Sequence, residues 1–266
     1  MKRSLSAAAA LLLLCTCAIP TAAADSATIY VTVADENGDL ALAQSAVTVT
    51  DTDNDGALTV NDALYAAHEA FYEGGASVGY GSGMTDYGLS MSKLWGCENG
   101  GSYGYYVNNA SAWSLADPVA DGDYVNAFVY TDLVAWSDTY CFFDVETVSG
   151  VSGDTVTLTL SAAGYDADYN PITVPVKDAV ITVNGEATSY VTDENGSVSI
   201  LLGNSGVMTV SATSDTQTIV PPVCTINVAS QSIYAPQTGD NTALLALGAG
   251  ALLTAVLTSR KKLHEN

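Results

Sequence analysis

The stretch Ala27-Thr28-Ile29-Tyr30-Val31-Thr32-Val33 alternates apolar and polar side chains, which is the pattern of a β-strand with one buried face. The pair Asn37-Gly38 follows it and is typical of a hairpin turn. A second strand is expected near residues 46–50, where apolar and polar residues alternate again. The sequence therefore predicts that the first domain opens with a β-hairpin.

A helix and further strands are expected after this hairpin. Residues 62–73 predict a helix with one apolar face, and Gly74-Gly75 would end it. Strands are predicted at residues 103–107 and 124–131, which are rich in tyrosine and valine. Hairpin, helix and then strands is the order of a β-grasp fold. We therefore expect a β-grasp-like domain over residues 25–146.

A second domain is expected over residues 150–229, after a Ser/Gly/Val-rich boundary at residues 147–153. Its short alternating segments and Asn-Gly turns predict an immunoglobulin-like β-sandwich. The expected strands are residues 155–162, 179–183, 197–202 and 207–212. The predicted fold class is thus mainly β with one α-helix, a β-grasp-like N-terminal domain plus an immunoglobulin-like β-sandwich.

Two runs in the second domain carry a resemblance. Asp178-Ala179-Val180-Ile181-Thr182-Val183-Asn184-Gly185 is followed by Thr192-Asp193-Glu194-Asn195-Gly196. Together they resemble bacterial immunoglobulin-like domains and the stalk domains of collagen adhesins. The resemblance implies that this domain is a spacer.

The charge balance excludes some classes of partner. The 266 residues include 7 Lys+Arg and 29 Asp+Glu, so the formal net charge is −22. Between the two ends of the chain, Lys93 and Lys177 are the only basic residues. Such a surface repels phosphate, so we expect no nucleic-acid partner and no peripheral binding to anionic lipid. With 48% hydrophobic residues, the chain has enough apolar surface to fold.

The N-terminal end predicts a secretory signal peptide over residues 1–24. A basic start at residues 2–3 precedes an apolar run at residues 7–19 and the small residues Ala22-Ala23-Ala24, where a signal peptidase would cut. A transmembrane anchor is one alternative, which the short apolar run disfavours. A lipidated cysteine is another, but neither cysteine of this run follows the small residue that lipidation requires.

The C-terminal end, residues 230–266, carries a more specific pattern. Ala235-Pro236-Gln237-Thr238-Gly239 precedes an apolar stretch at residues 243–259 and a basic cluster at residues 260–262. This order resembles the sorting signal of Gram-positive surface proteins, whose motif is Leu-Pro-x-Thr-Gly. Pro236, Thr238 and Gly239 match the motif, whereas Ala235 replaces its leucine.

The sorting signal implies how the protein is held at the cell surface. A sortase would attack the Thr238 carbonyl and transfer it to an amine of the peptidoglycan, and the chain from Gly239 onward would be lost. The apolar stretch would cross the membrane only before sorting, with the basic cluster kept inside. The expected location is therefore secreted and cell-wall-anchored, with a plain single-pass anchor as the alternative.

The run Asp51-Thr52-Asp53-Asn54-Asp55-Gly56-Ala57-Leu58-Thr59-Val60-Asn61-Asp62 matches a calcium loop. Carboxylates fall at positions 1, 3, 5 and 12, and glycine at position 6 permits the sharp turn. The predicted ligands are Asp51, Asp53, Asp55, the Ala57 carbonyl, Thr59 through its hydroxyl or a water, and Asp62.

A strand, not a helix, is expected before this loop, and position 12 is aspartate. The loop therefore resembles those of dockerins, although no second repeat is present. We expect a structural calcium ion that pins the hairpin to the helix. The alternative is an acidic, solvated turn that caps the helix.

A second resemblance lies in Gly104-Tyr105-Tyr106-Val107-Asn108-Asn109, followed by Asp121-Gly122-Asp123-Tyr124-Val125. A similar run occurs in a domain of unknown function related to the C-terminal domain of transcobalamin and intrinsic factor. The resemblance implies a β-grasp-like binding module and corrinoid as one ligand, with Tyr105, Tyr106 and Trp113 as candidate contacts. The alternative is that these aromatic residues only build the core and a turn.

Cysteine and histidine usage says little about chemistry. Cys97 and Cys141 fall in the same expected domain and are the candidate disulfide, which would leave Cys224 free. The alternative for all three is a buried small apolar residue. His68 is the single histidine between the two processed ends, and no His-Glu-x-x-His motif is present. We therefore expect no enzyme.

The function that these observations predict is a cell-wall-anchored surface binding protein. Its calcium-stabilised outer domain would bind an unknown ligand or a host surface. Corrinoid capture is one alternative, and an adhesin or structural surface component is another.

Overall fold

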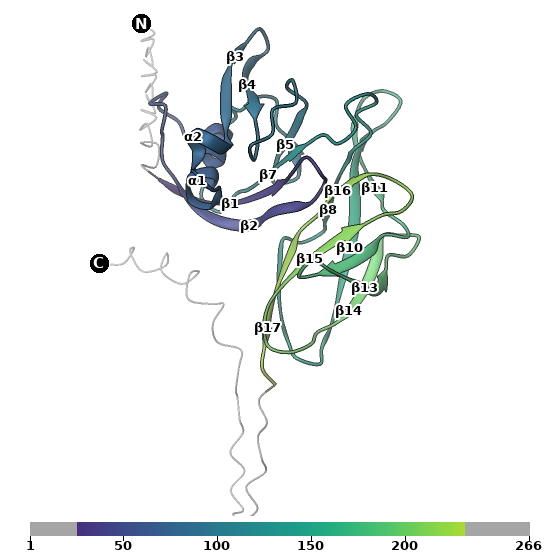
Figure 1. Cartoon of the computed structure of the whole chain (residues 1–266). Helices are drawn as coiled ribbons and strands as arrows, with labels where there is room; N and C mark the ends of the chain where they lie inside the picture. Colours follow the sequence, from purple (N-terminus) through teal and green to yellow (C-terminus); the bar gives the residue numbers. More distant parts are fainter. Residues whose placement is uncertain (1–25, 232–266) are drawn as a thin grey trace, which may run out of the picture. The chain divides into compact units, whose positions relative to one another are not determined.

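The computed structural model describes residues 26–231, which form one compact unit with two β-rich lobes (Figure 1). We call residues 26–130 the N-terminal lobe and residues 138–231 the C-terminal lobe. The predicted signal peptide and the predicted sorting signal, with Pro236, Thr238 and Gly239, lie outside the described residues. Within residues 26–231, no helix is long and apolar enough to cross a membrane.

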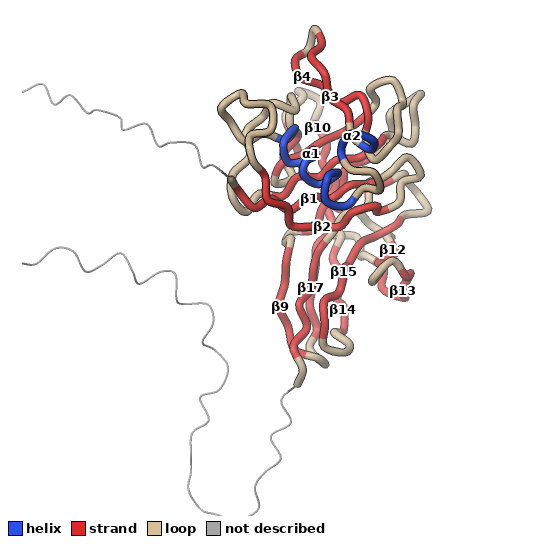
Figure 2. The backbone as a smooth tube through the Cα atoms, turned by 60° about the vertical axis from the view of Figure 1, so that its left-hand side comes forward, coloured by secondary structure: helices blue, strands red, loops and turns tan. Residues whose placement is uncertain are grey.

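The N-terminal lobe has the β-grasp arrangement that the sequence predicts. Its sheet has the order β2-β1-β7-β5-β6, in which β1 and β7 are parallel and the other pairs are antiparallel. Helix α1 packs on one face of this sheet (Figure 2). The bounds are β1 Ala27–Ala34, β2 Leu40–Val49, α1 Val60–Phe71, β5 Tyr103–Val107, β6 Ala110–Ser111 and β7 Tyr124–Val129.

Alternation decides which side chains fill this core. Ile29, Val31 and Val33 on β1 have no exposed surface, and neither do Ala63 and Leu64 on α1. Each fully buried aliphatic side chain contributes about 1.5–3 kcal/mol relative to an exposed one. The strand and the helix therefore hold each other through one continuous apolar layer.

A short insertion follows α1 that the sequence does not announce. It consists of α2 (Ala76–Gly79) and the separate hairpin of β3 (Gly81–Thr85) and β4 (Gly88–Lys93). Most side chains of β3 are exposed, and the strand is rich in glycine and serine. It therefore lacks the half-buried alternation by which a strand is recognised.

The C-terminal lobe is a sandwich of two sheets around one apolar cluster, as predicted. One sheet has the order β11-β10-β8-β16, with β14 also paired to β10, and the other has the order β13-β12-β15-β17-β9. The bounds are β8 Thr139–Phe143, β9 Thr147–Val151, β10 Thr155–Tyr165, β11 Pro171–Pro175, β12 Val180–Val183, β13 Glu186–Val191, β14 Ser197–Leu201, β15 Gly206–Thr213, β16 Ile219–Val220 and β17 Cys224–Ala229.

The boundary between the lobes differs from the expected one. Strand β8 pairs with β10 and β16, so residues 139–143 belong to the C-terminal lobe and not to a first domain ending at residue 146. Strand β9 occupies the stretch expected as a boundary, and it pairs in parallel with β17. Both differences arise because strands that are far apart in the sequence pair with each other. Local composition does not indicate such pairing.

Aromatic stacking joins the two lobes. Tyr106 of β5 stacks on Tyr140 of β8 with ring centroids 3.6 Å apart and an interplanar angle of 7°. Phe128 and Ala34 from the N-terminal lobe share this cluster with Val220 from β16, and all three are buried. The junction therefore has a small apolar core of its own.

A hydrogen-bond network lies beside this aromatic core. The Gln44 side chain donates to Glu146 Oε2 (2.8 Å) and accepts from the Thr225 hydroxyl (2.6 Å). Asn109 Nδ2 donates to Glu146 Oε1 (2.8 Å), and the Tyr140 hydroxyl donates to Asn109 Oδ1 (2.8 Å). Partial burial raises the pKa of Glu146. Because every member has a partner, the network fixes the junction instead of weakening it.

The same turn, which begins with an aspartate, occurs three times, over residues 35–39, 166–170 and 193–197. In each, the first aspartate accepts hydrogen bonds from the backbone N–H groups two and four residues later, at 2.8–3.0 Å. The fourth residue has a left-handed backbone, with φ of +77° at Gly38, +63° at Tyr169 and +74° at Gly196. Tyr169 thus stands where the other two turns use glycine.

This comparison predicts opposite effects of two substitutions. Tyr169→Gly should raise the free energy of unfolding by up to about 1 kcal/mol, because it relieves a left-handed non-glycine residue that is 84% exposed. Gly196→Ala should lower it by about 2 kcal/mol or more, because its Cβ would lie 2.2 Å from the Leu160 carbonyl oxygen. Urea denaturation measures both. A Tyr169→Gly variant that is less stable than wild type would contradict the inference that the left-handed backbone at Tyr169 is strained.

His68 is buried inside a cage of aromatic rings from Tyr72, Tyr80 and Trp95. Its Nδ1 lies 2.7 Å from the Leu64 carbonyl, and its Nε2 accepts from the Trp95 N–H at 3.0 Å. One nitrogen must carry a proton and the other must not, so the ring is neutral. Burial lowers the pKa of His68.

This arrangement predicts acid sensitivity. As the pH falls below about 6.5, the unfolded chain takes up a proton on His68 while the folded state resists it, so stability is lost. Between pH 7.5 and 5.5, wild-type protein should lose more stability than His68→Gln, by up to about tenfold in the folding constant per pH unit. Equal losses in chemical denaturation at the two pH values would show that His68 is not the sensor.

Candidate metal centre

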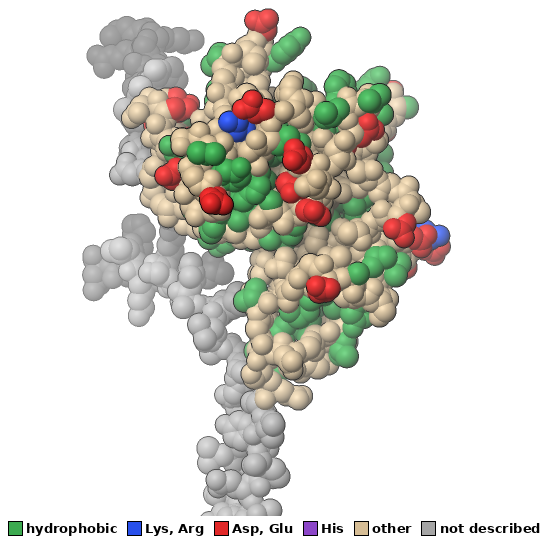
Figure 3. Space-filling model, viewed as in Figure 1, with side chains coloured by type: hydrophobic (Ala, Val, Ile, Leu, Met, Phe, Trp, Pro, Cys, Tyr) green, Lys and Arg blue, Asp and Glu red, His purple; other side chains and the backbone are tan. Residues whose placement is uncertain are grey.

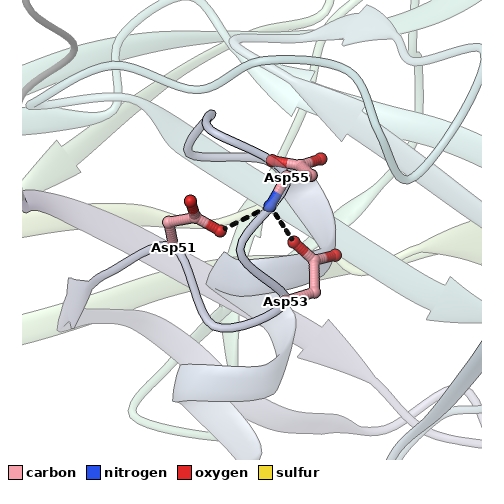
Figure 4. A group of neighbouring side chains, drawn as sticks. All are labelled: Asp51, Asp53 and Asp55. Carbon is pink, nitrogen blue, oxygen red and sulfur yellow. Dashed lines mark hydrogen bonds between the residues drawn. The ribbon is translucent and has the colours of Figure 1, made fainter.

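Three aspartates of the predicted calcium loop come together. Asp51, Asp53 and Asp55 lie between β2 and α1, and each brings one carboxylate oxygen to within 4.8 Å of the other two (Figure 4). All three carboxyl groups are at least partly exposed, so an ion could reach them from solvent. Hard oxygen donors of this kind are the ligands that calcium prefers.

The backbone holds these carboxylates in place. The Asp55 N–H donates to Asp51 Oδ1 (3.1 Å) and to Asp53 Oδ1 (3.3 Å), and the Gly56 N–H donates to Asp51 Oδ2 (2.9 Å). Asn54 and Gly56 have positive φ angles of 59° and 90°. The loop therefore winds tightly around the carboxylates, and glycine at its sixth position supplies the sharp turn.

Asp62, at the twelfth position, is not part of this group. It is fully buried, and its Oδ1 accepts from the Thr52 N–H (2.9 Å) and the Thr52 hydroxyl. Its Oδ2 accepts from the Thr59 N–H (3.1 Å) and the Thr59 hydroxyl (2.8 Å). The carboxylate that we expected as a ligand is thus engaged in fastening the loop to the first turn of α1.

The two remaining expected ligands differ in their roles. Thr59 is the N-cap of α1, and its hydroxyl both accepts from the Asp62 N–H and donates to the Asp62 carboxylate. Because the Asp62 carboxylate also accepts from the Thr59 N–H, the two residues form a capping box, and the hydroxyl is occupied. Ala57 lies in the loop itself, with its N–H on Asp55 Oδ1 at 2.9 Å. Leu58, at the eighth loop position, packs into the core.

Asn61 contributes to the loop although the sequence did not single it out. Its Nδ2 donates to Asp53 Oδ2 (3.3 Å), and its Oδ1 accepts from the Tyr80 hydroxyl (3.0 Å). The amide therefore connects the loop to the residue that follows α2. The feature of the sequence that could have indicated this role is the amide side chain of Asn61, directly before the last loop position.

Mutual repulsion marks the loop electrostatically. Partial burial, and then the charges of Asp55, Asp62 and Asp51, raise the pKa of Asp53. No Lys or Arg among the described residues relieves this repulsion, because Lys93 pairs with Glu98 and Lys177 lies beside Asp178. A divalent cation is the partner that would neutralise the three carboxylates together.

The candidate ligand contacts Tyr105, Tyr106 and Trp113 do not share one surface. Successive side chains of a strand point to opposite faces, and Tyr105 packs on the core of the N-terminal lobe whereas Tyr106 packs into the junction. Trp113 follows β6 and is 93% exposed. The structure therefore brings together no aromatic pocket from these three residues.

The expected disulfide is not formed. All three described cysteines are free. Cys97 packs against the core of the N-terminal lobe, whereas Cys141 and Cys224 are buried in the core of the C-terminal lobe. The prediction failed because it placed β8 in the wrong domain. Burial raises the pKa of Cys141 and of Cys224 to about 12, so both behave as apolar residues.

The run Gly75-Ala76-Ser77-Val78-Gly79 has the spacing of a nucleophile elbow, which we did not anticipate from the sequence. It forms the four-residue helix α2 and its N-cap instead of a turn from a strand into a long helix. The ring nitrogens of His68 contact Leu64 and Trp95. The run therefore lacks the context that gives such a serine its reactivity.

Comparisons with known proteins add no identification. No protein-family model matches the chain, and no curated protein sequence matches it either. The metal loop and the surfaces of the two lobes therefore carry the functional argument by themselves.

The loop geometry predicts that one substitution has different effects on stability with and without calcium. Calcium at a hundredfold excess over its dissociation constant should raise the free energy of unfolding of wild-type protein by about 3 kcal/mol. Asp53→Asn should lose most of this gain. In a chelator the same variant should be at least as stable as wild type, because one repelling charge is gone.

Two further variants serve as controls in the same thermal melts. Asp86→Asn removes a charge from the exposed β3–β4 turn and should keep the full calcium response. Asp62→Asn should be destabilised even in chelator, by about 1–3 kcal/mol, because four donors lose their carboxylate. A calcium response that survives Asp53→Asn would refute the site.

Proposed function

We propose that this chain is a cell-wall-anchored surface protein of a Gram-positive cell, whose calcium-stabilised N-terminal lobe binds a partner. The signal-like N-terminus and the sorting-like C-terminus support the location. The compact C-terminal sandwich suits the spacer role that its resemblance to stalk domains implies. The observation that carries the binding function is a set of exposed aromatic and apolar side chains on the N-terminal lobe.

We use the name distal patch for three exposed side chains: Met84 and Tyr87 of the β3–β4 hairpin, and Trp113 of a loop that is hydrogen-bonded to β4. They are 78%, 92% and 93% exposed, respectively. Met84 and Tyr87 lie at the tip of the β3–β4 hairpin, where hydrophobic and acidic side chains lie together on the surface (Figure 3). Tyrosine and tryptophan are enriched among the residues that dominate binding energy at interfaces.

Hydrogen bonds hold the distal patch on ordered backbone. The Leu115 N–H (3.1 Å) and the Ser114 hydroxyl (3.2 Å) both donate to the Leu89 carbonyl, which ties the Trp113 loop to β4. The Trp113 N–H donates to Asp117 Oδ2 at 2.7 Å. A preorganised surface loses less conformational entropy on binding, so exposure on a fixed loop favours a recognition role.

The calcium loop supports the same surface indirectly. Asn61 connects Asp53 to Tyr80, which is the residue between α2 and the β3–β4 hairpin. In this proposal the ion stabilises the part of the lobe from which the hairpin projects. The metal has a structural role, and the hairpin makes the contact.

An adhesion assay tests the binding function. Beads coated with the full-length chain should adhere to at least one surface in a panel of immobilised extracellular glycoproteins and polysaccharides. The double variant Tyr87→Ser/Trp113→Ser should lose at least about 90% of that adhesion, as expected when two central aromatic contacts are removed.

Tyr169→Ser is the matched control, because Tyr169 is 84% exposed but lies on the C-terminal lobe. It should adhere like wild type. If the double variant adheres as well as wild type, the distal patch is not the binding surface. The location is tested separately by cell-wall fractionation, where Thr238→Ala should move the protein from the wall to the membrane fraction.

A further inference from the structure

A cleft lies at the junction of the two lobes, away from both the metal loop and the distal patch. Its volume is about 440 Å³, within the range of small-molecule sites. The β1–β2 turn and the end of β7 form one side, and residues 212–221, from the end of β15 to just beyond β16, form the other. No residue that the proposed function uses lines it.

One wall of the cleft is fixed by a buried carboxylate. Asp138 accepts hydrogen bonds from the Thr131 N–H (2.9 Å), the Thr131 hydroxyl (2.7 Å) and the Asp132 N–H (2.9 Å). The Asp132 carboxylate in turn accepts from three donors of its own loop, which lower its pKa to about 2. The loop from Thr131 to Asp138 is therefore preorganised without any ligand.

The apolar lining of the cleft is equally fixed. Phe128, Ala34 and Val220 line it and belong to the packed aromatic core of the junction. Because these three side chains are at most 7% exposed, they only close the bottom of the cleft, and the apolar surface that a ligand ring can contact comes from the partly exposed Ile219 and Pro221. It cannot bond to charged or strongly polar groups.

The opposite wall offers polar groups. Residues Thr213 to Thr218 contribute hydroxyl, carboxylate and amide side chains. Within residues 26–231, the side chains of Asp215, Gln217 and Thr218 form no hydrogen bond with the protein. These groups are therefore available to a ligand. Asn37 of the β1–β2 turn adds its amide oxygen, while its Nδ2 donates to Asp35 Oδ2 at 3.4 Å.

Charge restricts the ligand class further. The residues that line the cleft include Asp138 and Asp215 but no Lys, Arg or His. A phosphate, a sulfate or a carboxylate would therefore meet repulsion with no compensating partner. The ligand must instead bring hydrogen-bond donors, carried by hydroxyl or amine groups.

We propose that this cleft binds a small saccharide that is neutral or carries amines, about two rings in size. Its ring C–H face would lie on the apolar lining, and its hydroxyl groups would bond to Gln217, Asp215 and Asn37. The volume, the apolar surface and the acceptor-rich, base-free wall each favour this class. The proposal is independent of the distal patch, so either can fail alone.

Three disaccharide probes of different charge test it with the purified full-length chain. Cellobiose is neutral, the glucosamine disaccharide is cationic, and digalacturonic acid is anionic. Saturation-transfer NMR and calorimetric titration should show binding of at least one of the first two, in the millimolar range or tighter. Digalacturonic acid should bind at least about tenfold more weakly.

Variants locate the binding site. Gln217→Ala should weaken binding about fivefold, as expected for one lost hydrogen bond. Thr216→Trp should abolish it by filling the cleft, whereas Ser205→Trp, on the exposed turn between β14 and β15, should leave it unchanged. Should Thr216→Trp melt far below wild type, Gln217→Ala alone decides the question.

Three results would overturn the proposal. The first is that neither the neutral nor the cationic probe binds at tens of millimolar, which is a few times the largest dissociation constant expected of such a site. The second is binding that Gln217→Ala leaves unchanged. The third is equal binding of the anionic probe, because the charge argument would then be wrong.

Discussion

The buried carboxylate of Asp62 holds the N-terminal lobe together at its most acidic point. Four donors from Thr52 and Thr59 converge on it, so a charge that would be costly to bury alone becomes the fastening between loop and helix. Because α1 begins at this fastening and covers the sheet, the path of the chain from β2 to the core depends on it. The three outer aspartates are then free to face solvent and a cation.

A partly buried carboxylate with hydrogen-bond donors also fixes the junction between the two lobes. Glu146 is partly buried, and its two oxygens accept from the amides of Gln44 and Asn109. Gln44 lies on β2, and Asn109 lies in the turn between β5 and β6. Tyr106 and Tyr140 add a stacked apolar contact beside this network. A polar network with every member satisfied specifies one arrangement, whereas an apolar contact alone would tolerate sliding. The cleft with its fixed Thr131–Asp138 wall exists because this arrangement is specified.

The sequence predicted what local patterns encode. The alternation of Ile29, Val31 and Val33 gave the first strand, and the spacing of Asp51, Asp53 and Asp55 gave the acidic group of the loop. The sequence could not show that Asp62 binds Thr52 and Thr59 instead of the ion. An aspartate at this position matches both the twelfth residue of a calcium loop and the third residue of a capped helix. Nor could the sequence place β8, whose partners β10 and β16 lie in later parts of the chain. The failed Cys97–Cys141 disulfide followed from that error, since a pairing argument is only as good as the domain assignment beneath it.

The N-terminal lobe pairs its first strand, β1, in parallel with its last strand, β7. A pull on the two ends of this lobe therefore drags two neighbouring strands lengthwise past each other, so that their hydrogen bonds are loaded together and cannot open one at a time. Forced unfolding is governed by the rate of crossing the unfolding barrier, and shear loading of this kind raises the force needed to cross it. The N-terminal lobe is thus built as a shear clamp, and it resists extension best along the line that joins Ala27 at the start of β1 to Val129 at the end of β7.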